Sequence, residues 1–243
     1  MRVSVAMATY NGAKYLRRQL DSILDNLSGE DEIVISDDGS TDETLEILAQ
    51  YQEKDNRIHL LDGPHKGVIS NFEYVIEACE GDYIFLSDQD DIWLPNKVDE
   101  VMKAFTTEDV YLVIHDAKVV GEDLSDTIMD SFFAYRGSRP GVWANLVKNR
   151  YMGCCMAFKK ELVPLVVPIP KDIPMHDQWI GMVSDRFFGK SCFLPEKLLL
   201  YRRHENAVSD FEHNSVGVMI KNRWMIYHHL KNRIREIRKE RKL

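Results

Sequence analysis

Tyr83-Ile84-Phe85-Leu86-Ser87-Asp88-Gln89-Asp90-Asp91 carries most of the information about the fold of this chain. Its apolar start predicts a short buried strand. Three carboxylates follow within four residues, and their mutual repulsion is unfavourable unless a cation or a proton offsets it. Carboxylate oxygens are hard ligands that suit Mg²⁺ or Mn²⁺. The stretch therefore predicts a divalent cation at a strand end, placed to hold a diphosphate.

Strands and helices alternate along the first half of the chain. Residues 3–8 and 32–36 are apolar runs that predict strands, and each is followed by a turn and a helical period. The capping box Ser40-Thr41-Asp42-Glu43 is expected to open the second helix, and Pro95 is expected to be the first residue of another. This alternation predicts an α/β fold with a mostly parallel sheet and helices on both of its faces.

Three polar turns follow the predicted strands, at residues 9–12, 37–39 and 88–91. Ligands of such sheets bind outside the carboxyl ends of the strands, so we expect the three turns to meet in one crevice. The second half of the chain is less regular. There we expect a strand with a bulge over residues 111–120 and a proline-rich loop over residues 163–175.

The composition is that of a globular protein. The chain has 243 residues, 44% hydrophobic and 29% charged, which is enough for one large α/β domain with an appendage. No apolar run reaches the length of about 18 residues that a membrane span needs, and we expect no signal peptide. The four cysteines (Cys79, Cys154, Cys155 and Cys192) lack metal-site spacing and are interpreted as core thiols. These features together predict a cytoplasmic protein.

The charge is distributed unevenly. The net charge is −8, yet residues 217–243 carry nine Lys or Arg against Glu236 and Glu240, which leaves −15 on the rest. An acidic body argues against nucleic-acid binding. In the basic segment, apolar residues recur at helical spacing from Tyr227 to Ile237. Two interpretations stay open: a helix lying on an anionic membrane surface, or a helix packed on the body.

Five motifs in a fixed order resemble the family-two inverting glycosyltransferases of the GT-A fold. They are Ala8-Thr9-Tyr10-Asn11-Gly12, Ser36-Asp37-Asp38-Gly39-Ser40-Thr41-Asp42, Ser87-Asp88-Gln89-Asp90-Asp91-Ile92-Trp93, His176-Asp177-Gln178-Trp179 and Tyr201-Arg202-Arg203-His204-Glu205-Asn206-Ala207-Val208-Ser209. The Asp-Gln-Asp-Asp-Ile-Trp form is similar to the bacterial branch that includes rhamnosyltransferases of surface-polysaccharide synthesis.

The resemblance implies a domain organisation. A GT-A domain would cover residues 1–209, with a nucleotide-binding half over residues 1–115 and an acceptor-binding half over residues 116–209. Residues 210–243 would form the basic helical extension.

The resemblance also implies a nucleotide site, made by Thr9, Tyr10, Asn11, Asp38 and Asp88. Lys66, which precedes a predicted helix, is expected to approach the sugar or the ribose of the same nucleotide. Asp38 would accept a hydrogen bond from the pyrimidine ring N–H, a donor that uracil and thymine both offer to a carboxylate. The alternative is that Asp37 or Asp38 only caps the helix after Gly39. Because Ser40 is expected to supply that cap, we favour the functional role for one of the two acids.

The remaining motif positions would carry the chemistry. Asp88 and Asp90 match the metal motif, with His204 as a further ligand of Mn²⁺ or Mg²⁺. Arg202 and Arg203 would bind the diphosphate. Asp177 matches the catalytic base, which takes the acceptor hydroxyl proton in an inverting transfer. His176 departs from the family pattern, in which many relatives have an acid. Gln178 and Trp179 would contact the acceptor.

The function expected is transfer of rhamnose or a hexose from a dTDP- or UDP-sugar to a glycan on a polyprenyl diphosphate carrier, at the inner face of the cell membrane. One alternative is a sugar-phosphate nucleotidyltransferase. Its first turn would be basic, whereas this chain has no basic residue there until Lys14. The other alternative is a non-catalytic nucleotide-sugar-binding protein at the membrane.

Overall fold

The computed structural model describes residues 1–107, 109–189, 191–205 and 215–240. The strands are β1 (Val3–Thr9), β2 (Glu32–Asp37), β3 (Ile58–Asp62), β4 (Tyr83–Ser87), β5 (Ile92–Trp93), β6 (Leu112–Val120), β7 (Thr127–Met129), β8 (Met156–Lys159) and β9 (Cys192–Arg202). The helices are α1 (Ala13–Leu24), α2 (Thr44–Lys54), α3 (Val68–Ala78), α4 (Lys97–Phe105), α5 (Phe132–Arg136), α6 (Val142–Val147), α7 (Val163–Val166), α8 (His176–Phe187) and α9 (Val216–Glu240). Two short 3-10 turns, η1 (Gly153–Cys155) and η2 (Lys160–Leu162), flank β8.

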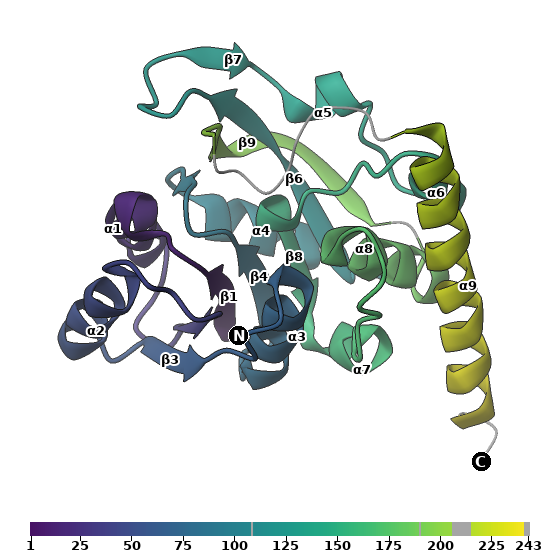
Figure 1. Ribbon diagram of the computed structural model, residues 1–243, viewed down its shortest axis with the longest axis horizontal. Coiled ribbons are helices and arrows are strands. Elements are labelled where there is room, and N and C mark those ends of the chain that lie inside the picture. Colours follow the sequence, from purple (N-terminus) through teal and green to yellow (C-terminus); the bar gives the residue numbers. More distant parts are fainter. Residues whose placement is uncertain (108, 190, 206–214, 241–243) are drawn as a thin grey trace.

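A single sheet runs through the molecule in the order β3-β2-β1-β4-β8-β6-β9-β5, with β7 paired to β6 (Figure 1). The strands β3, β2, β1 and β4 are all parallel to one another. Beyond them β8 lies antiparallel between β4 and β6, while β9 is parallel to β6. The predicted α/β fold is confirmed, and the parallel arrangement is complete in the half that carries the three polar turns.

The central strands are buried on both faces, as their apolar runs predict. Every residue of β2 is buried, and β1 is buried except at Ala8. Helix α3 packs on β1 and β2, while α4 packs on β6 and β9. The expected bulge in β6 is confirmed, because its register against β9 shifts around Asp116.

Two expected helix starts are wrong. Helix α2 begins at Thr44, because the Ser40 hydroxyl donates to Asp37 Oδ2 (2.6 Å) and does not cap the helix. Helix α4 begins at Lys97 after Asn96, whose φ of 66° is left-handed, so Pro95 lies outside the helix. The local pattern predicts neither the contact between Ser40 and Asp37 nor the left-handed backbone of Asn96. The proline-rich loop also contains the short helix α7.

Helix α9 lies along one edge of the molecule, away from α1 and α2 (Figure 1). It packs on α6 and α8 and buries Ile226, Leu230 and Ile237. The interpretation that the helix packs on the rest of the protein is therefore confirmed for the face that carries Ile226, Leu230 and Ile237, whereas Tyr227 is exposed. The expected boundary after residue 209 lies outside the described residues. Among the helices that are described, none is both long and apolar enough to cross a membrane.

Candidate active site

The turns after β1, β2 and β4 meet, as the strand pattern predicts. Thr9 and Asp37 are register partners, and Thr9 Oγ1 donates to Asp37 Oδ2 (2.8 Å). The Gln89 side chain brackets Tyr10: it accepts from the Tyr10 backbone N–H and donates to the Tyr10 carbonyl, both at 2.9 Å. A Cβ at Gly12 would lie 2.2 Å from Gln89 Oε1, so only glycine leaves room for this contact.

The two acids of the second turn have different surroundings. Asp37 is buried and accepts from Thr9 Oγ1, from the Ser40 hydroxyl and from two backbone N–H groups. Asp38 is partly exposed, and its carboxylate accepts from the backbone N–H groups of Lys66 (3.1 Å) and Gly67 (2.7 Å). Asp37 therefore holds the turn together, while Asp38 is the more exposed acid of the two.

The other predicted nucleotide residues of these turns have separate contacts, and only Lys66 bonds the Asp38 side chain, through its backbone N–H. Tyr10 is exposed. The Asn11 side chain accepts from the Thr41 backbone N–H (2.8 Å), which joins the first and second turns. Lys66 is exposed and follows His65, whose ring Nδ1 would lie 3.0 Å from a Cβ added at Gly39. His65 was not among the predicted site residues, because a single histidine in a loop is more often structural.

The acidic cluster lies at the end of β4. Burial, followed by the charges of Asp90 and Asp177, raises the pKa of Asp88 to about 7. Asp91 is fully buried, and burial raises its pKa well above the ordinary value. Its Oδ1 accepts from the Arg202 backbone N–H (3.0 Å), but its Oδ2 has no hydrogen-bond partner. Such a site favours a proton or a cation over two free negative charges.

The segment after β9 closes over this cluster. His204 Nε2 lies 2.8 Å from Asp90 Oδ2, and the His204 ring packs on Tyr15 with 4.6 Å between centroids. Arg202 donates through Nε to the Asp90 carbonyl (2.6 Å) and through Nη1 to the Glu122 carbonyl (2.6 Å). Arg202 therefore holds the acidic loop, and only its Nη2 is buried without a partner.

Arg203 lies between Arg202, the last residue of β9, and His204. Its backbone N–H donates to the Val120 carbonyl (2.9 Å), which extends the pairing of β9 with β6. The side chain is half-buried. The described part of this motif ends at residue 205, so Asn206 to Ser209 lie outside it.

The donor atoms fit a hard divalent cation. The predicted set is Asp88 and Asp90 with His204, of which Asp90 and His204 are in contact. The group of three ligand atoms that lie within 4.8 Å of one another among the described residues is instead Asp88, Asp91 and Cys154. Burial raises the pKa of the Cys154 thiol well above its ordinary value, and a thiol must lose its proton to bind a metal. The carboxylates are therefore the better ligands, and the unpartnered Asp91 Oδ2 lies beside them.

A buried lysine lies beneath the acids. Lys97 Nζ donates to the Cys154 carbonyl (2.9 Å) and lies 3.9 Å from the centre of the Trp93 ring. Burial lowers its pKa to about 8. Lys97 was not among the predicted site residues, because a lysine in the first turn of a helix looks the same whether that turn faces solvent or the core.

Asp177 lies in the first turn of α8 and is buried. Its Oδ1 accepts from Asn149 Nδ2 (3.0 Å) and from the Gln178 backbone N–H (2.5 Å). Burial raises its pKa to about 6, while these hydrogen bonds oppose the rise. The 3-10 turn η1 lies between Asp177 and the acidic cluster: a Cβ on Gly153 would lie 3.6 Å from Asp177 Cβ, and the ligand atoms of Cys154, Asp88 and Asp91 lie within 4.8 Å of one another. Asn149 was not predicted either, because nothing in its local pattern relates it to residue 177.

The neighbours of Asp177 have packing roles. His176 stacks on Phe72 at 4.0 Å, and burial lowers its pKa to about 3, so it is neutral. Gln178 Nε2 donates to the Asn145 carbonyl (2.7 Å). Trp179 is fully buried and donates to the Val166 carbonyl (2.8 Å), so the expected acceptor contact of this side chain has no support in its placement.

The chain is similar to known glycosyltransferases. The profile of the family described as Glycosyl transferase family 2 matches residues 4–164. The dTDP-rhamnosyl transferase RfbG of Shigella flexneri is 31% identical over 230 residues, which are 88% of this chain and 74% of that protein. An uncharacterized glycosyltransferase of Nostoc sp. is 29% identical over 212 residues, 84% of this chain and 65% of that protein.

Solved structures share the fold. S. aureus TarS 1-349 in complex with UDP-GlcNAc has a TM-score of 0.73 at 18% identity, over 93% of this chain and 65% of that one. The mannosyltransferase PcManGT from Pyrobaculum calidifontis, in complex with GDP-Man and Mn²⁺, has a TM-score of 0.66 at 18% identity, over 85% and 58%. The chain thus spans about two thirds or less of the length of several proteins that it resembles. The matched profile, the RfbG identity and the GT-A-like sheet agree, and the chain belongs to glycosyltransferase family 2.

Proposed function

We propose that this protein is an inverting, metal-dependent glycosyltransferase that moves rhamnose or a hexose from a dTDP- or UDP-sugar to a glycan acceptor in cell-surface polysaccharide synthesis. One observation carries the proposal. The short turn η1 lies against Asp177 through Gly153 and against Asp88 and Asp91 through Cys154. This arrangement supports a single site in which a base for the acceptor acts beside acids for the diphosphate.

The acceptor side supplies the base. The acceptor hydroxyl oxygen forms a bond to the anomeric carbon while its proton passes to the Asp177 carboxylate. The bond from that carbon to the diphosphate oxygen breaks on the opposite face, so the configuration inverts. A pKa of about 6 suits this role, because the carboxylate is charged at neutral pH and still basic enough to take a proton. Asn149 positions the carboxylate through its 3.0 Å hydrogen bond.

The donor side supplies recognition and charge. The Asp38 carboxylate would accept the pyrimidine N–H, with Tyr10 over the ring. Asp88, Asp90 and His204 would hold Mn²⁺ or Mg²⁺, which when bound neutralises the charge of the departing diphosphate. The free N–H of Arg202 Nη2 is available to a phosphate oxygen. The similarity to the dTDP-rhamnosyl transferase RfbG supports a dTDP-sugar, and the Mn²⁺ of the PcManGT complex supports that metal.

The acceptor is proposed to be lipid-linked, at the inner face of the cell membrane. A polyprenyl diphosphate carrier would keep the growing glycan at the cytoplasmic surface, where nucleotide sugars are made. The basic helix α9 supports this location, since Lys and Arg are attracted to anionic lipid headgroups.

The experiment separates donor binding from turnover. With Mn²⁺ present, the correct nucleotide sugar should raise the melting temperature and undergo transfer or slow hydrolysis. Asp90→Ala should lose the metal-dependent shift. Asp177→Ala should keep the shift but lose turnover, and Asp99→Ala, an exposed acid on α4, is the matched control. Full activity of Asp177→Ala would contradict the base assignment, and no shift with any dTDP- or UDP-sugar would contradict the donor assignment.

The same assay tests the alternatives. A nucleotidyltransferase would release pyrophosphate from a nucleoside triphosphate, which neither the family membership nor the first turn favours. The lysine nearest to that turn is Lys14, at the start of α1, and it is paired with Glu122. A non-catalytic binding protein would show the thermal shift without turnover in the unmodified chain.

A further inference from the structure

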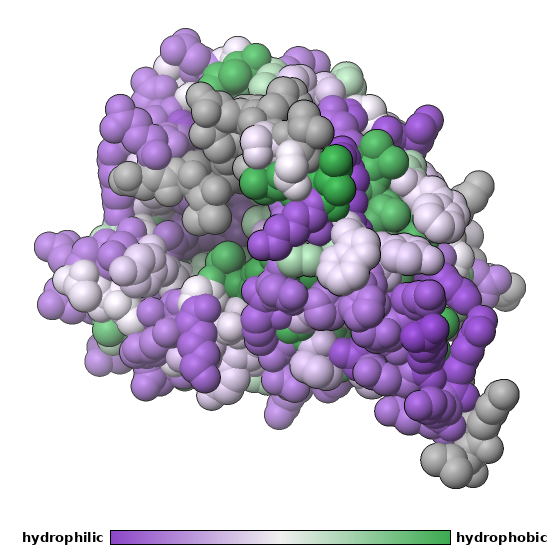
Figure 2. Space-filling view, turned by 45° about the vertical axis from the view of Figure 1, so that its right-hand side comes forward, coloured by the Kyte–Doolittle hydropathy of each residue, from purple (hydrophilic) through white to green (hydrophobic). Residues whose placement is uncertain are grey.

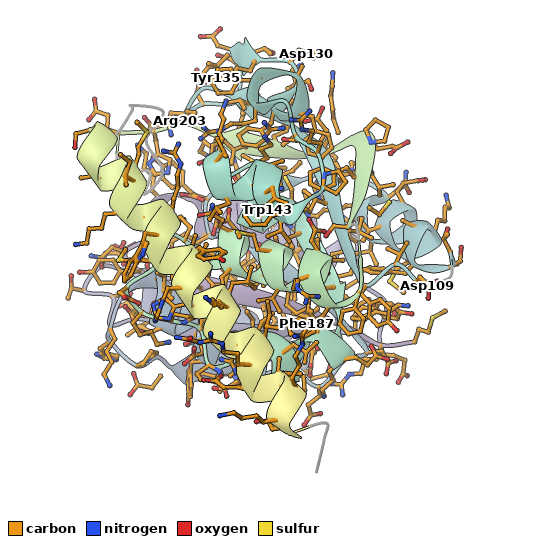
Figure 3. The ribbon with its side chains drawn as sticks, turned by 90° about the vertical axis from the view of Figure 1, so that its right-hand side faces the viewer. Asp109, Asp130, Tyr135, Trp143, Phe187 and Arg203 are labelled. Carbon is orange, nitrogen blue, oxygen red and sulfur yellow. The ribbon has the colours of Figure 1, made fainter. Side chains whose placement is uncertain are left out.

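An aromatic surface lies where α6 meets α9, far from the interior. We define the α6–α9 surface by Trp143, Val147, Ile220, Trp224 and Tyr227, all of which are exposed. The exposed fraction is 72% for Trp143 and 64% for Trp224. The Trp143 ring packs near the Tyr227 ring, 6.3 Å between centroids, and Figure 3 shows Trp143 on α6 beside α9.

This surface is separate from the face that α9 buries. Its α9 members are four and three residues apart, the spacing of a single helix face. The buried face, which carries Leu230, points in another direction. Helix α9 therefore has two apolar faces, and the body covers one of them. Exposed apolar patches of this kind mark sites of contact with proteins or membranes.

The two segments that carry the surface are rich in positive charge. Residues 135–150 and 216–235 contain nine Lys or Arg and no Asp or Glu, although the whole chain has a net charge of −8. Two acids from other segments contact them: Asp185 accepts from the Gly141 backbone N–H, and Asp172 lies 2.8 Å from His229. Arg223 joins the two segments by donating through Nη2 to the Val147 carbonyl (2.6 Å). Figure 2 shows pale side chains of intermediate hydropathy gathered near the middle of this face, with hydrophilic ones along the outer part of α9.

We propose that the α6–α9 surface lies on an anionic lipid membrane, with the two exposed tryptophans at the depth of the headgroups. Tryptophan and tyrosine favour the membrane–water interface, and nearby Lys and Arg are attracted to anionic lipid. A second copy of the chain is disfavoured, because a two-fold contact would bring the cations of both copies together. A soluble polyanion would use the cations but not the exposed rings.

This location deepens the proposed function, on which it rests, because α6 leads directly to the proposed base. The Asn145 carbonyl of α6 accepts from Gln178, and Asn149, two residues after α6 ends, donates to Asp177. A membrane in contact with α6 would lie on the acceptor side of the site. The carrier of a lipid-linked acceptor would then stay in the bilayer while the glycan reaches Asp177.

Tryptophan fluorescence gives a direct test. Of the four tryptophans, Trp93 and Trp179 are buried, so Trp143 and Trp224 report on the surface. The probes are vesicles of phosphatidylcholine alone, and vesicles that also contain phosphatidylglycerol with brominated acyl chains. We expect sedimentation with the anionic vesicles, a blue shift and bromine quenching. With neutral vesicles we expect much weaker binding.

Charge variants test the electrostatic part. Lys148→Glu with Lys221→Glu should lower the partition coefficient on anionic vesicles by about tenfold or more, since each basic residue near the surface contributes about fivefold. The matched control is Lys54→Glu with Lys103→Glu, two exposed lysines on α2 and α4 that give the same change in net charge. The control should bind several-fold better than the surface variant.

Aromatic variants test the contact itself. Trp143→Ser with Trp224→Ser should weaken sedimentation with anionic vesicles. Leu45→Ser with Tyr74→Ser, which changes exposed apolar residues on α2 and α3, should leave sedimentation and bromine quenching unchanged. All variants should retain the donor-induced thermal shift in solution, so a failure of donor binding would count against the proposed function and leave the vesicle result standing.

Several outcomes would overturn the inference. Equal binding to neutral and anionic vesicles, equal losses in surface and control variants, or sedimentation without bromine quenching would each do so. Binding of soluble polyphosphate without vesicle binding would assign the surface to an anionic polymer. Self-association that Trp143→Ser with Trp224→Ser abolishes, without vesicle binding, would assign it to a second copy.

Discussion

Two polar regions of this molecule differ in whether their buried polar atoms have hydrogen-bond partners. In the turn network, formed by Thr9, Asn11, Asp37, Ser40 and Thr44, the polar side chains bond one another and the backbone. Across described residues 1–67, no buried side-chain nitrogen or oxygen lacks a partner. In the acidic region, by contrast, Asp91 Oδ2, His204 Nδ1 and Arg202 Nη2 are all buried without one.

The difference indicates what each region is for. A fully satisfied network is rigid and holds a loop in one geometry. Buried polar atoms without partners are rare in native proteins and call for a ligand, an ion or a water. The turn network therefore holds the three turns in place, while the unpartnered atoms of the acidic region are consistent with the proposed ligand site. Changes in the first should cost stability, and changes in the second should cost activity.

The largest expected effect is on turnover. Asp177→Asn keeps the shape of the side chain but cannot take a proton, so transfer should fall by about 10²- to 10⁴-fold. Donor affinity should change little, because the proposed function assigns Asp177 to the acceptor. Steady-state kinetics and calorimetry with the donor would measure the two quantities. Weakened donor binding with a normal maximal rate would contradict the assignment of Asp177 as the base.

The pH dependence should show opposite trends for activity and stability. Burial raises the pKa of Asp177 to about 6 from 3.8. Below pH 6 the base is protonated, so kcat/KM should fall about tenfold per pH unit. The folded state then binds a proton that the unfolded state releases, so this group makes the free energy of unfolding rise as pH falls from 6 toward 3.8.

The control for this profile is Asp177→Asn. Its residual activity should lack the inflection near pH 6, and its urea unfolding should lack the corresponding gain in stability at low pH. An unchanged inflection in the variant would show that another group, such as Asp88, is responsible.

A change in the turn network should cost stability. Thr9→Val removes the hydroxyl that donates to the buried Asp37, so the free energy of unfolding should fall by about 1.5–3 kcal/mol. Thr106→Val, which removes an exposed hydroxyl at the end of α4, should change it by less than about 0.5 kcal/mol. Urea unfolding measures both. Similar losses in the two variants would show that the turn network contributes no more to stability than an exposed hydroxyl does.

The smallest expected effect has the opposite sign. Asp91→Asn removes a buried carboxyl that has an unpartnered oxygen and a raised pKa, so the metal-free protein should gain about 1 kcal/mol in unfolding free energy. Stabilisation by Mn²⁺ should decrease in the same variant. Asp99→Asn on the surface is the reference. A loss of stability as large as that of Thr9→Val would show that the Asp91 carboxyl is held by hydrogen bonds, like the side chains of the turn network.

The parts of the site predicted from the sequence are those that depend on short-range pattern. The apolar runs predict β1, β2 and β4, and polar turns after parallel strands meet at the same sheet edge. The convergence of Thr9, Asp37 and Gln89 follows from that rule. The expected capping role of Ser40 failed because its hydroxyl bonds the Asp37 side chain, a competition that the capping pattern does not register.

The parts that could not be predicted depend on contacts between distant segments. Lys97 lies under the acids only because η1 passes beneath α4, 57 residues later in the chain. Asn149 reaches Asp177 across 28 residues. The same holds for α9, where spacing indicates an amphipathic helix but not which of its apolar faces the body covers.

Local patterns in the chain were enough to establish an α/β sheet with acids at the ends of its strands, because hydrophobic period and turn chemistry act over a few residues. Tertiary packing was needed to show that Asp37 is buried while Asp38 is partly exposed, that Lys97 is buried, and that Trp143 of α6 packs near Tyr227 of α9 on the surface. Burial and pairing depend on which distant segments pack together, and no local pattern records that choice.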